Sequence, residues 1–158
     1  MRGLIVLSVL FCAAVSAQTA SFEIDVAGHA PLTLSAADLA DMPQHTISVS
    51  EHGQQVTYTG VLIADVLTKA GAPMGAQLRG KALSSYMLAT ARDGYTVIYA
   101  LPEFDSAFTD AQPLIAMSAG GKPLDNNQGP FRIVMPQDKK PARSLRMLQK
   151  IEVVQLRK

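Results

Sequence analysis

Alternation of apolar and polar residues divides most of this 158-residue chain into short β-strands. The pattern predicts strands at 22–26, 32–34, 45–50, 55–59, 131–134 and 150–156, and a continuous apolar strand at 113–119 that is buried on both faces. Gly53 lies between the strands predicted at 45–50 and 55–59, so these two strands are expected to form a hairpin. Asp93-Gly94 divides residues 86–100 into a second hairpin, because this dipeptide favours tight turns.

Helical signals are fewer and shorter. Ser35 and Asp38 have the spacing of a capping box, which predicts a helix over 35–41. Residues 62–70 carry an apolar stripe at helical spacing, and Gly71 is placed to cap the helix that this stripe predicts. One-turn helices are expected at 101–104, where proline occupies the second position, and at 144–148. Residues 74–84, with one turn at most, and 120–130 are expected to be loops.

Many short strands and few short helices, without strand–helix–strand alternation, define the fold class. The sequence predicts an α+β fold with mixed, largely antiparallel sheets. No internal repeat is present.

The first residues have the features of an export leader. Arg2 provides a positive start, residues 3–15 form an uncharged apolar run, and Val15-Ser16-Ala17 is a small-residue cleavage site. This apolar run is too short for a membrane span. We therefore expect residues 1–17 to be a Sec-type signal peptide, residues 18–158 to be one domain without a membrane span, and the mature protein to reside in the periplasm.

Charge and cysteine content narrow the classes of function. Without Arg2, the chain has 13 basic and 13 acidic residues. This balance argues against nucleic-acid binding, which requires a basic surplus. The one cysteine, Cys12, lies in the expected leader, so the mature chain is predicted to have neither a disulfide nor a thiolate ligand.

The order of several motifs resembles a known family. "YTGVLIADVLTKAG" is followed by "ARDGYTVIYALPEF", "GKPL", "GPFRIVMP" and "ARSLRMLQKIEVV". This order, over residues 22–156, resembles the molybdopterin-binding domain of the sulfite oxidase family in its small, single-domain periplasmic version. The resemblance implies that family's mixed α+β fold, which agrees with the pattern of strands and helices.

The redox chemistry of the family requires residues that this chain does not match. In redox members, a cysteine that follows the strand reading "HTISVSEHG" here ligates molybdenum. This region contains Ser48, Ser50 and Glu51 and no cysteine, and hard oxygen ligands do not replace a soft thiolate equivalently. The resemblance also implies export of a folded, loaded enzyme behind a twin-arginine signal, whereas this leader contains only Arg2. We therefore expect no catalytic residues and no cofactor.

Cations near the end of the chain form the predicted site. The resemblance places Arg143 and Arg146 where redox members grip the pterin phosphate, and on the expected helical turn they would share a face. Together with Arg132, and with Asp93 and Tyr95 at the mouth, they are predicted to form a pocket for a small anion. Lys139 and Lys140 are expected to be solvated charges, and a solvated edge remains the alternative for the arginines.

Metal sites are not predicted. His29, His45 and His52 are scattered, and no third ligand accompanies the pair at 45 and 52. The leading hypothesis is therefore a periplasmic binding or accessory module that binds a small anionic ligand or an envelope protein partner. The alternative is a molybdopterin-dependent periplasmic oxidoreductase in which Ser50 or Glu51 replaces the cysteine.

Overall fold

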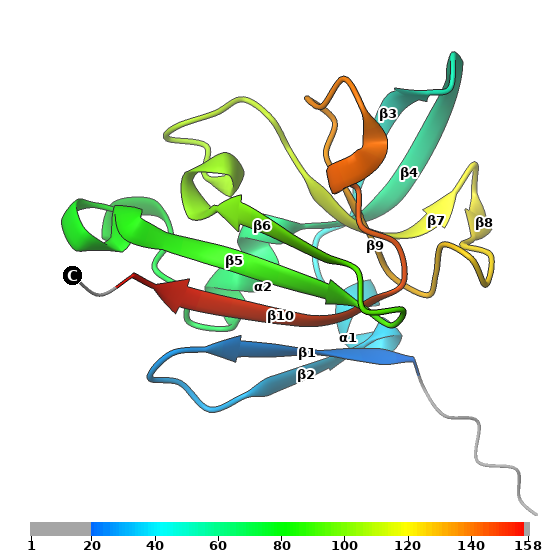
Figure 1. The fold of residues 1–158 in the computed structure, drawn as a ribbon. Helices are drawn as coiled ribbons and strands as arrows, with labels where there is room; N and C mark the ends of the chain where they lie inside the picture. The colour runs from blue at the N-terminus through cyan, green and yellow to red at the C-terminus, as the bar shows by residue number, and fades with distance from the viewer. Residues whose placement is uncertain (1–19, 157–158) are drawn as a thin grey trace, which may run out of the picture.

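Two five-stranded sheets form the frame of the protein (Figure 1), which we describe over residues 20–156 from a computed structural model. The first sheet has the order β2-β1-β10-β5-β6, and the second has the order β3-β4-β7-β8 with β9 paired to β7. Every strand pair is antiparallel except β1 with β10. The predicted α+β class with largely antiparallel sheets is therefore confirmed. The expected leader, including Cys12, lies outside the described residues.

The elements follow the predicted order. The strands are β1 Ser21–Val26, β2 Leu32–Ser35, β3 His45–Glu51, β4 Gln54–Leu62, β5 Ser85–Ala91, β6 Thr96–Ala100, β7 Leu114–Ala119, β8 Lys122–Pro123, β9 Arg132–Val134 and β10 Leu148–Gln155. The α-helices are α1 Ala36–Ala40 and α2 Ile63–Lys69, and the 3-10 helices are η1 Gly75–Gln77, η2 Gly80–Ser84, η3 Leu101–Phe104 and η4 Pro141–Arg143. No helix within residues 20–156 has the length and apolar character needed to cross a bilayer.

Local signals determine both α-helices. The Ser35 hydroxyl accepts the Asp38 backbone N–H at 3.2 Å, and the Asp38 carboxylate accepts the Ser35 N–H at 2.8 Å, as in a capping box. Helix α2 buries Ile63, Val66 and Leu67, and the chain leaves it through Gly71 at φ 85°. Both helix predictions are confirmed.

The main hydrophobic core lies beneath the first sheet and against α2. Phe22 and Phe131 meet there edge to face, with their ring centroids 5.1 Å apart. A smaller cluster around Val49 and Tyr58 packs between β3, β4, β7 and β9. Strand β7 is fully buried only from Leu114 to Ala116, so the expectation of two-sided burial along its whole length was too broad.

Two loop predictions and one helix prediction need correction. Residues 74–84 form two 3-10 helices rather than one turn, and the loop at 120–130 contains the short strand β8. The helical turn expected at 144–148 lies earlier, at Pro141–Arg143, and β10 already begins at Leu148. The reason is tertiary, because the Ile133 N–H donates to the Leu145 carbonyl at 2.8 Å and the buried Ser144 hydroxyl accepts the Met135 N–H at 3.1 Å. These bonds hold residues 144–145 beside β9 in a non-helical conformation.

Candidate functional site

Two cavities meet along the segment of residues 141–146, which we call the dividing segment. The smaller cavity, of about 390 Å³, is lined by Asp93, Tyr95 and Asn127. The larger, of about 540 Å³, is lined by Glu51, His52, Gln128, Arg132 and Lys140. Pro141, Ala142 and Arg146 line both. Cavities of this size suit small-molecule ligands.

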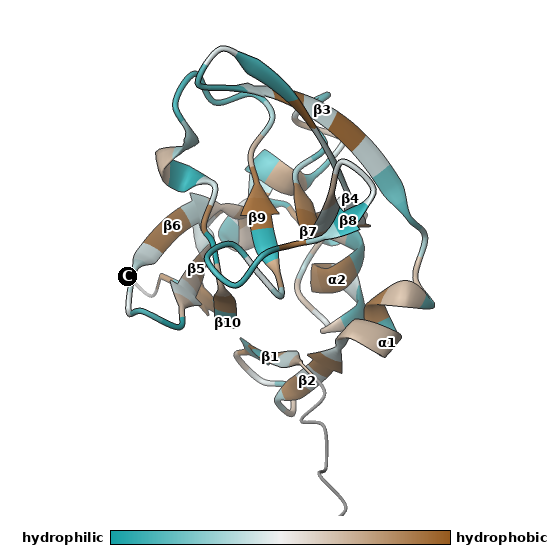
Figure 2. Cartoon of the chain, turned by 90° about the vertical axis from the view of Figure 1, so that its right-hand side faces the viewer, coloured by the Kyte–Doolittle hydropathy of each residue, from teal (hydrophilic) through white to brown (hydrophobic). Residues whose placement is uncertain are grey.

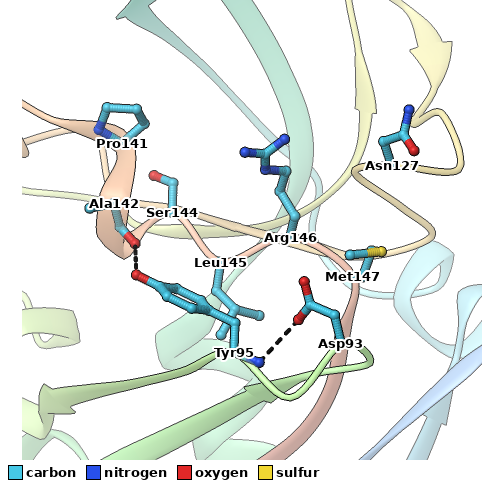
Figure 3. A pocket seen from close by; sticks show the side chains of 9 residues that line it. All are labelled: Asp93, Tyr95, Asn127, Pro141, Ala142, Ser144, Leu145, Arg146 and Met147. Carbon is cyan, nitrogen blue, oxygen red and sulfur yellow. Dashed lines mark hydrogen bonds between the residues drawn. The ribbon is translucent and has the colours of Figure 1, made fainter.

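The turn between β5 and β6 forms one side of the smaller cavity (Figure 3). The Asp93 carboxylate accepts the Tyr95 backbone N–H at 3.0 Å, and Gly94 supplies the positive φ of 86° that the turn requires. The Tyr95 hydroxyl donates to the Ala142 carbonyl at 3.0 Å, which ties the β5–β6 turn to the dividing segment. Tyr95 and Asp93 therefore lie at the same cavity as Arg146.

A buried ionic network forms the inner wall of the larger cavity. Arg132 is the polar residue of the hydrophobic strand β9 (Figure 2) and is only 4% exposed. Its Nη2 donates to Glu51 at 2.6 Å, and its Nη1 donates to the Tyr58 hydroxyl and to the Gln128 amide oxygen. The Tyr58 hydroxyl donates in turn to the second oxygen of Glu51 at 3.1 Å. The Arg132 charge is thus neutralised inside the protein.

Arg143 belongs to a different network. Its Nε and Nη2 donate to both oxygens of Asp138 at 2.8 and 2.7 Å, and its Nη1 donates to Glu103 at 2.7 Å. These carboxylates raise the pKa of Arg143, so it is fully charged. The guanidinium also lies 5.7 Å from the centre of the Tyr99 ring. Arg143 lines neither cavity, and its role in the fold is to attach η4 to β6 and η3.

Of the three arginines of the predicted site, Arg146 is the one that can still bind an external anion. It is exposed, and the ion pairs among residues 20–156 involve Arg132, Arg143 and Lys150 instead. In Figure 3 its guanidinium points away from Asp93 and Tyr95. The next residue, Met147, has a positive φ of 52°, and its backbone is fixed by the Gln128 carbonyl and the Arg92 N–H, each at 2.9 Å. This unusual backbone directs the chain out of the dividing segment and into β10.

The predicted site is therefore divided by the structure. Asp93, Tyr95 and Arg146 line the smaller cavity, and Arg132 and Arg146 line the larger one. The expectation that Arg143 and Arg146 share a helical face is wrong, because Arg146 lies beyond the end of η4. Glu51 was not predicted as the partner of Arg132, and Lys140 was not predicted as a cavity residue. No short-range pattern links Glu51 to Arg132, which are 81 residues apart.

The donor groups near the end of β3 do not fit a sulfur-ligated molybdenum centre. Ser48 is occupied by Thr57, with 3.0 Å between the two hydroxyl oxygens, and both oxygens of Glu51 are occupied by Arg132 and Tyr58. Ser50 is exposed, and no cysteine occurs after Cys12. Within residues 20–156, no three His, Cys, Asp or Glu side chains are grouped so that they could hold a metal ion. We therefore derive no reaction step through molybdenum.

The two sheets with their two short α-helices have the fold of a sulfite-oxidase-type domain. The chain belongs to the oxidoreductase molybdopterin binding domain family, whose model matches residues 12–158. Among solved structures, the sulfane dehydrogenase SoxCD from Paracoccus pantotrophus is similar, with a TM-score of 0.63 and 16% identity. The match covers 84% of this chain and 37% of that chain, so this protein spans well under half of its length. A comparison with curated proteins found no significant match.

The ionisation of Tyr58 offers a pH test of the buried network. Burial raises the pKa of Tyr58 to about 12, from 10.0. The protonated phenol therefore contributes stability that is complete below the unfolded pKa of about 10 and is lost as the pH rises towards 12.

We expect unfolding to begin at a lower pH in an alkaline titration of the wild type than in Tyr58→Phe, once the stability of each protein is normalised to its value at pH 8. Absorbance at 295 nm reports tyrosinate directly, since the chain has four tyrosines and no tryptophan. If the wild type and Tyr58→Phe lost the same amount of stability between pH 10 and 12, Tyr58 would not be the group responsible.

Proposed function

We propose that this protein is a binding module that holds a small anion in the larger cavity through Arg146 and Lys140. The observation that supports this proposal is the difference between Arg132, Arg143 and Arg146, the three arginines of the predicted site. Arg132 and Arg143 are neutralised by carboxylates, whereas Arg146 is exposed and lines both cavities. A phosphate, sulfate or carboxylate group is the chemistry that such a pair of cations recognises.

The charges that line the larger cavity favour an anion. The positive charge of Arg132 and the negative charge of Glu51 cancel at 2.6 Å. Lys140 and Arg146 then leave the cavity with a positive surplus. An anion there would exchange water for charge-assisted hydrogen bonds to the Lys140 and Arg146 side chains.

Removal of the Arg146 guanidinium tests the proposed site. Because a hydrogen bond to a charged group contributes about 1.5–3 kcal/mol, Arg146→Ala should weaken the binding of inorganic phosphate about tenfold or more. Lys139→Ala is the matched control, since it removes an exposed cation just before the dividing segment that lines neither cavity. Isothermal titration calorimetry at constant ionic strength measures both. Equal phosphate affinity in the wild type and Arg146→Ala would overturn the proposed site.

Membership of a molybdopterin-binding family favours a second candidate function. In that case the protein is a molybdopterin-dependent oxidoreductase in which Ser50 or Glu51 supplies an oxygen ligand. Ser50 is the better candidate of the two, because it is exposed while Glu51 is held by Arg132. Metal analysis and pterin fluorescence of protein purified from its native cells separate the two functions. Stoichiometric molybdenum with a pterin would favour the oxidoreductase, and their absence would favour the binding module.

The compartment and the type of ligand are part of the proposal. We place the mature protein in the periplasm, on the basis of the leader pattern in residues 1–17, and N-terminal sequencing after cell fractionation tests this. An envelope protein partner is the alternative occupant of the cavities. Such a partner would present its own carboxylate or phosphate to Arg146, so the same Arg146→Ala variant would release it in a pull-down from native envelopes.

A further inference from the structure

We infer that Glu51 acts as an internal ligand of Arg132, and that Arg132 becomes a second anion site of the larger cavity when Glu51 is neutralised or displaced. This inference deepens the proposed function, because both sites belong to the same cavity. The carboxylate of Glu51 would then hold the place of an external anion. The cavity would bind one anion at Arg146 in the resting protein and a second one at Arg132 only in competition with Glu51.

The first support is that Arg132 is incompletely satisfied. Its Nη1 and Nη2 have acceptors, but its Nε is buried and has no hydrogen-bond partner among the described residues. Buried donors in proteins nearly always have acceptors, so this N–H is an unused hydrogen-bond donor of the Arg132 side chain. Arg143 provides the contrast within the same chain, since its Nε, Nη1 and Nη2 are all bonded to carboxylates. The two arginines therefore differ in their capacity for a further anion.

The second support is the position of Glu51. It is the last residue of β3, directly before the turn formed by His52 and Gly53, which have φ values of 52° and 80°. Its side chain is 14% exposed and lines the larger cavity, whereas the Arg132 side chain is 5% exposed. The carboxylate thus separates a buried cation from a water-accessible space. An anion that entered this space could replace the carboxylate with a short displacement of the hairpin end.

The third support is the surrounding set of donors. Gln128 lines the cavity and accepts from Arg132 with its amide oxygen, while its amide nitrogen donates to Asp125 at 3.4 Å and keeps a second N–H for another acceptor. Tyr58 donates to Glu51 at 3.1 Å and would donate equally to another anionic oxygen. A tetrahedral or planar oxyanion at this place would therefore meet the Arg132 guanidinium together with two neutral donors. This is the hydrogen-bonding environment of a built anion site.

Substitution of Glu51 by glutamine tests the inference, because glutamine has nearly the same shape without the charge. Glu51→Gln should bind inorganic phosphate at least tenfold more tightly than the wild type, and this gain should persist in Glu51→Gln with Arg146→Ala. The gain should disappear in Glu51→Gln with Arg132→Met, which removes the buried cation. Calorimetry with phosphate at constant ionic strength measures all four proteins. A folded Glu51→Gln protein that binds phosphate no better than the wild type would overturn the inference.

Thermal unfolding covers the case in which the unpaired arginine prevents folding. The Tm of Glu51→Gln should then be higher in phosphate than in chloride at equal ionic strength. This increase in Tm should be at least twice the increase that the wild type shows between the same two solutions. Glu51→Met with Arg132→Met is the charge-free control and should show no such increase. A Glu51→Gln protein that stays unfolded in phosphate, while the charge-free control folds, also rejects the inference. Phosphate binding by Glu51→Gln but not by the wild type would reject only the Arg146 site, so the two proposals fail separately.

Discussion

Replacement of Arg132 by methionine is expected to lower the free energy of unfolding by about 3–5 kcal/mol. The substitution leaves Glu51, whose side chain is 14% exposed, without its cation, and it removes the donor to Tyr58 and Gln128. The cost of breaking a buried pair comes mainly from the partner that remains. Urea denaturation followed by circular dichroism measures the change.

The matching double substitution separates the loss of a pair from the loss of one partner. Glu51→Met together with Arg132→Met should recover most of the stability, because an apolar pair of similar volume needs no compensation. Lys150→Met is the surface control, since Lys150 lies 3.2 Å from Glu152 but is 35% exposed, and it should leave the urea midpoint almost unchanged. A loss of stability in Arg132→Met as small as that in Lys150→Met would show that the network is unimportant for folding.

Replacement of Gly60 by alanine is expected to lower the free energy of unfolding by about 3 kcal/mol or more. A Cβ at Gly60 would lie 2.0 Å from the Ile115 carbonyl oxygen and 2.7 Å from the Ala116 Cα. Both atoms belong to the backbone of β7, which cannot rotate away as a side chain can. The register between β4 and β7 shifts at Thr59/Gly60, so this close approach is part of the sheet.

Gly53→Ala is the matched control for Gly60→Ala. Gly53 has a φ of 80°, but a Cβ there would have no heavy atom within 4 Å, so only the backbone conformation opposes the substitution. That conformation costs about 1–2 kcal/mol for a residue with a side chain. Equilibrium unfolding in urea compares the two variants, and a smaller loss for Gly60→Ala than for Gly53→Ala would contradict the close packing of β4 on β7.

The features that the sequence predicted well depend on interactions between near neighbours. Ser35 with Asp38 and Asp93 with Gly94 form contacts three residues apart or fewer, and Gly71 caps α2 by donating to Thr68 at 3.0 Å. The stability of such contacts depends on the types of residues that are close together in the sequence, so a sequence pattern can predict them. The fold class followed from the order of these elements.

The candidate site was harder to predict because long-range contacts decide it. A pattern of cations could not indicate that Arg143 belongs to Glu103 and Asp138, or that Arg132 belongs to Glu51. The turn expected over 144–148 is absent for the same reason, since Ser144 and Leu145 accept hydrogen bonds from Met135 and Ile133, which outweigh local helical preference. Of the predicted arginines, the structure leaves Arg146 accessible at the cavities.

The parallel pairing of β1 with β10 has a consequence for how the molecule assembles. Ile24 lies opposite Ile151 in the middle of the first sheet, so the earliest strand finds its central neighbour more than 120 positions later in the chain. Strand β10 also pairs with β5, and it therefore joins the β1–β2 ribbon to the β5–β6 hairpin. Until β10 has been added, these two parts of the sheet have no hydrogen bonds to each other. Completion of this sheet therefore requires β10, the last strand within residues 20–156.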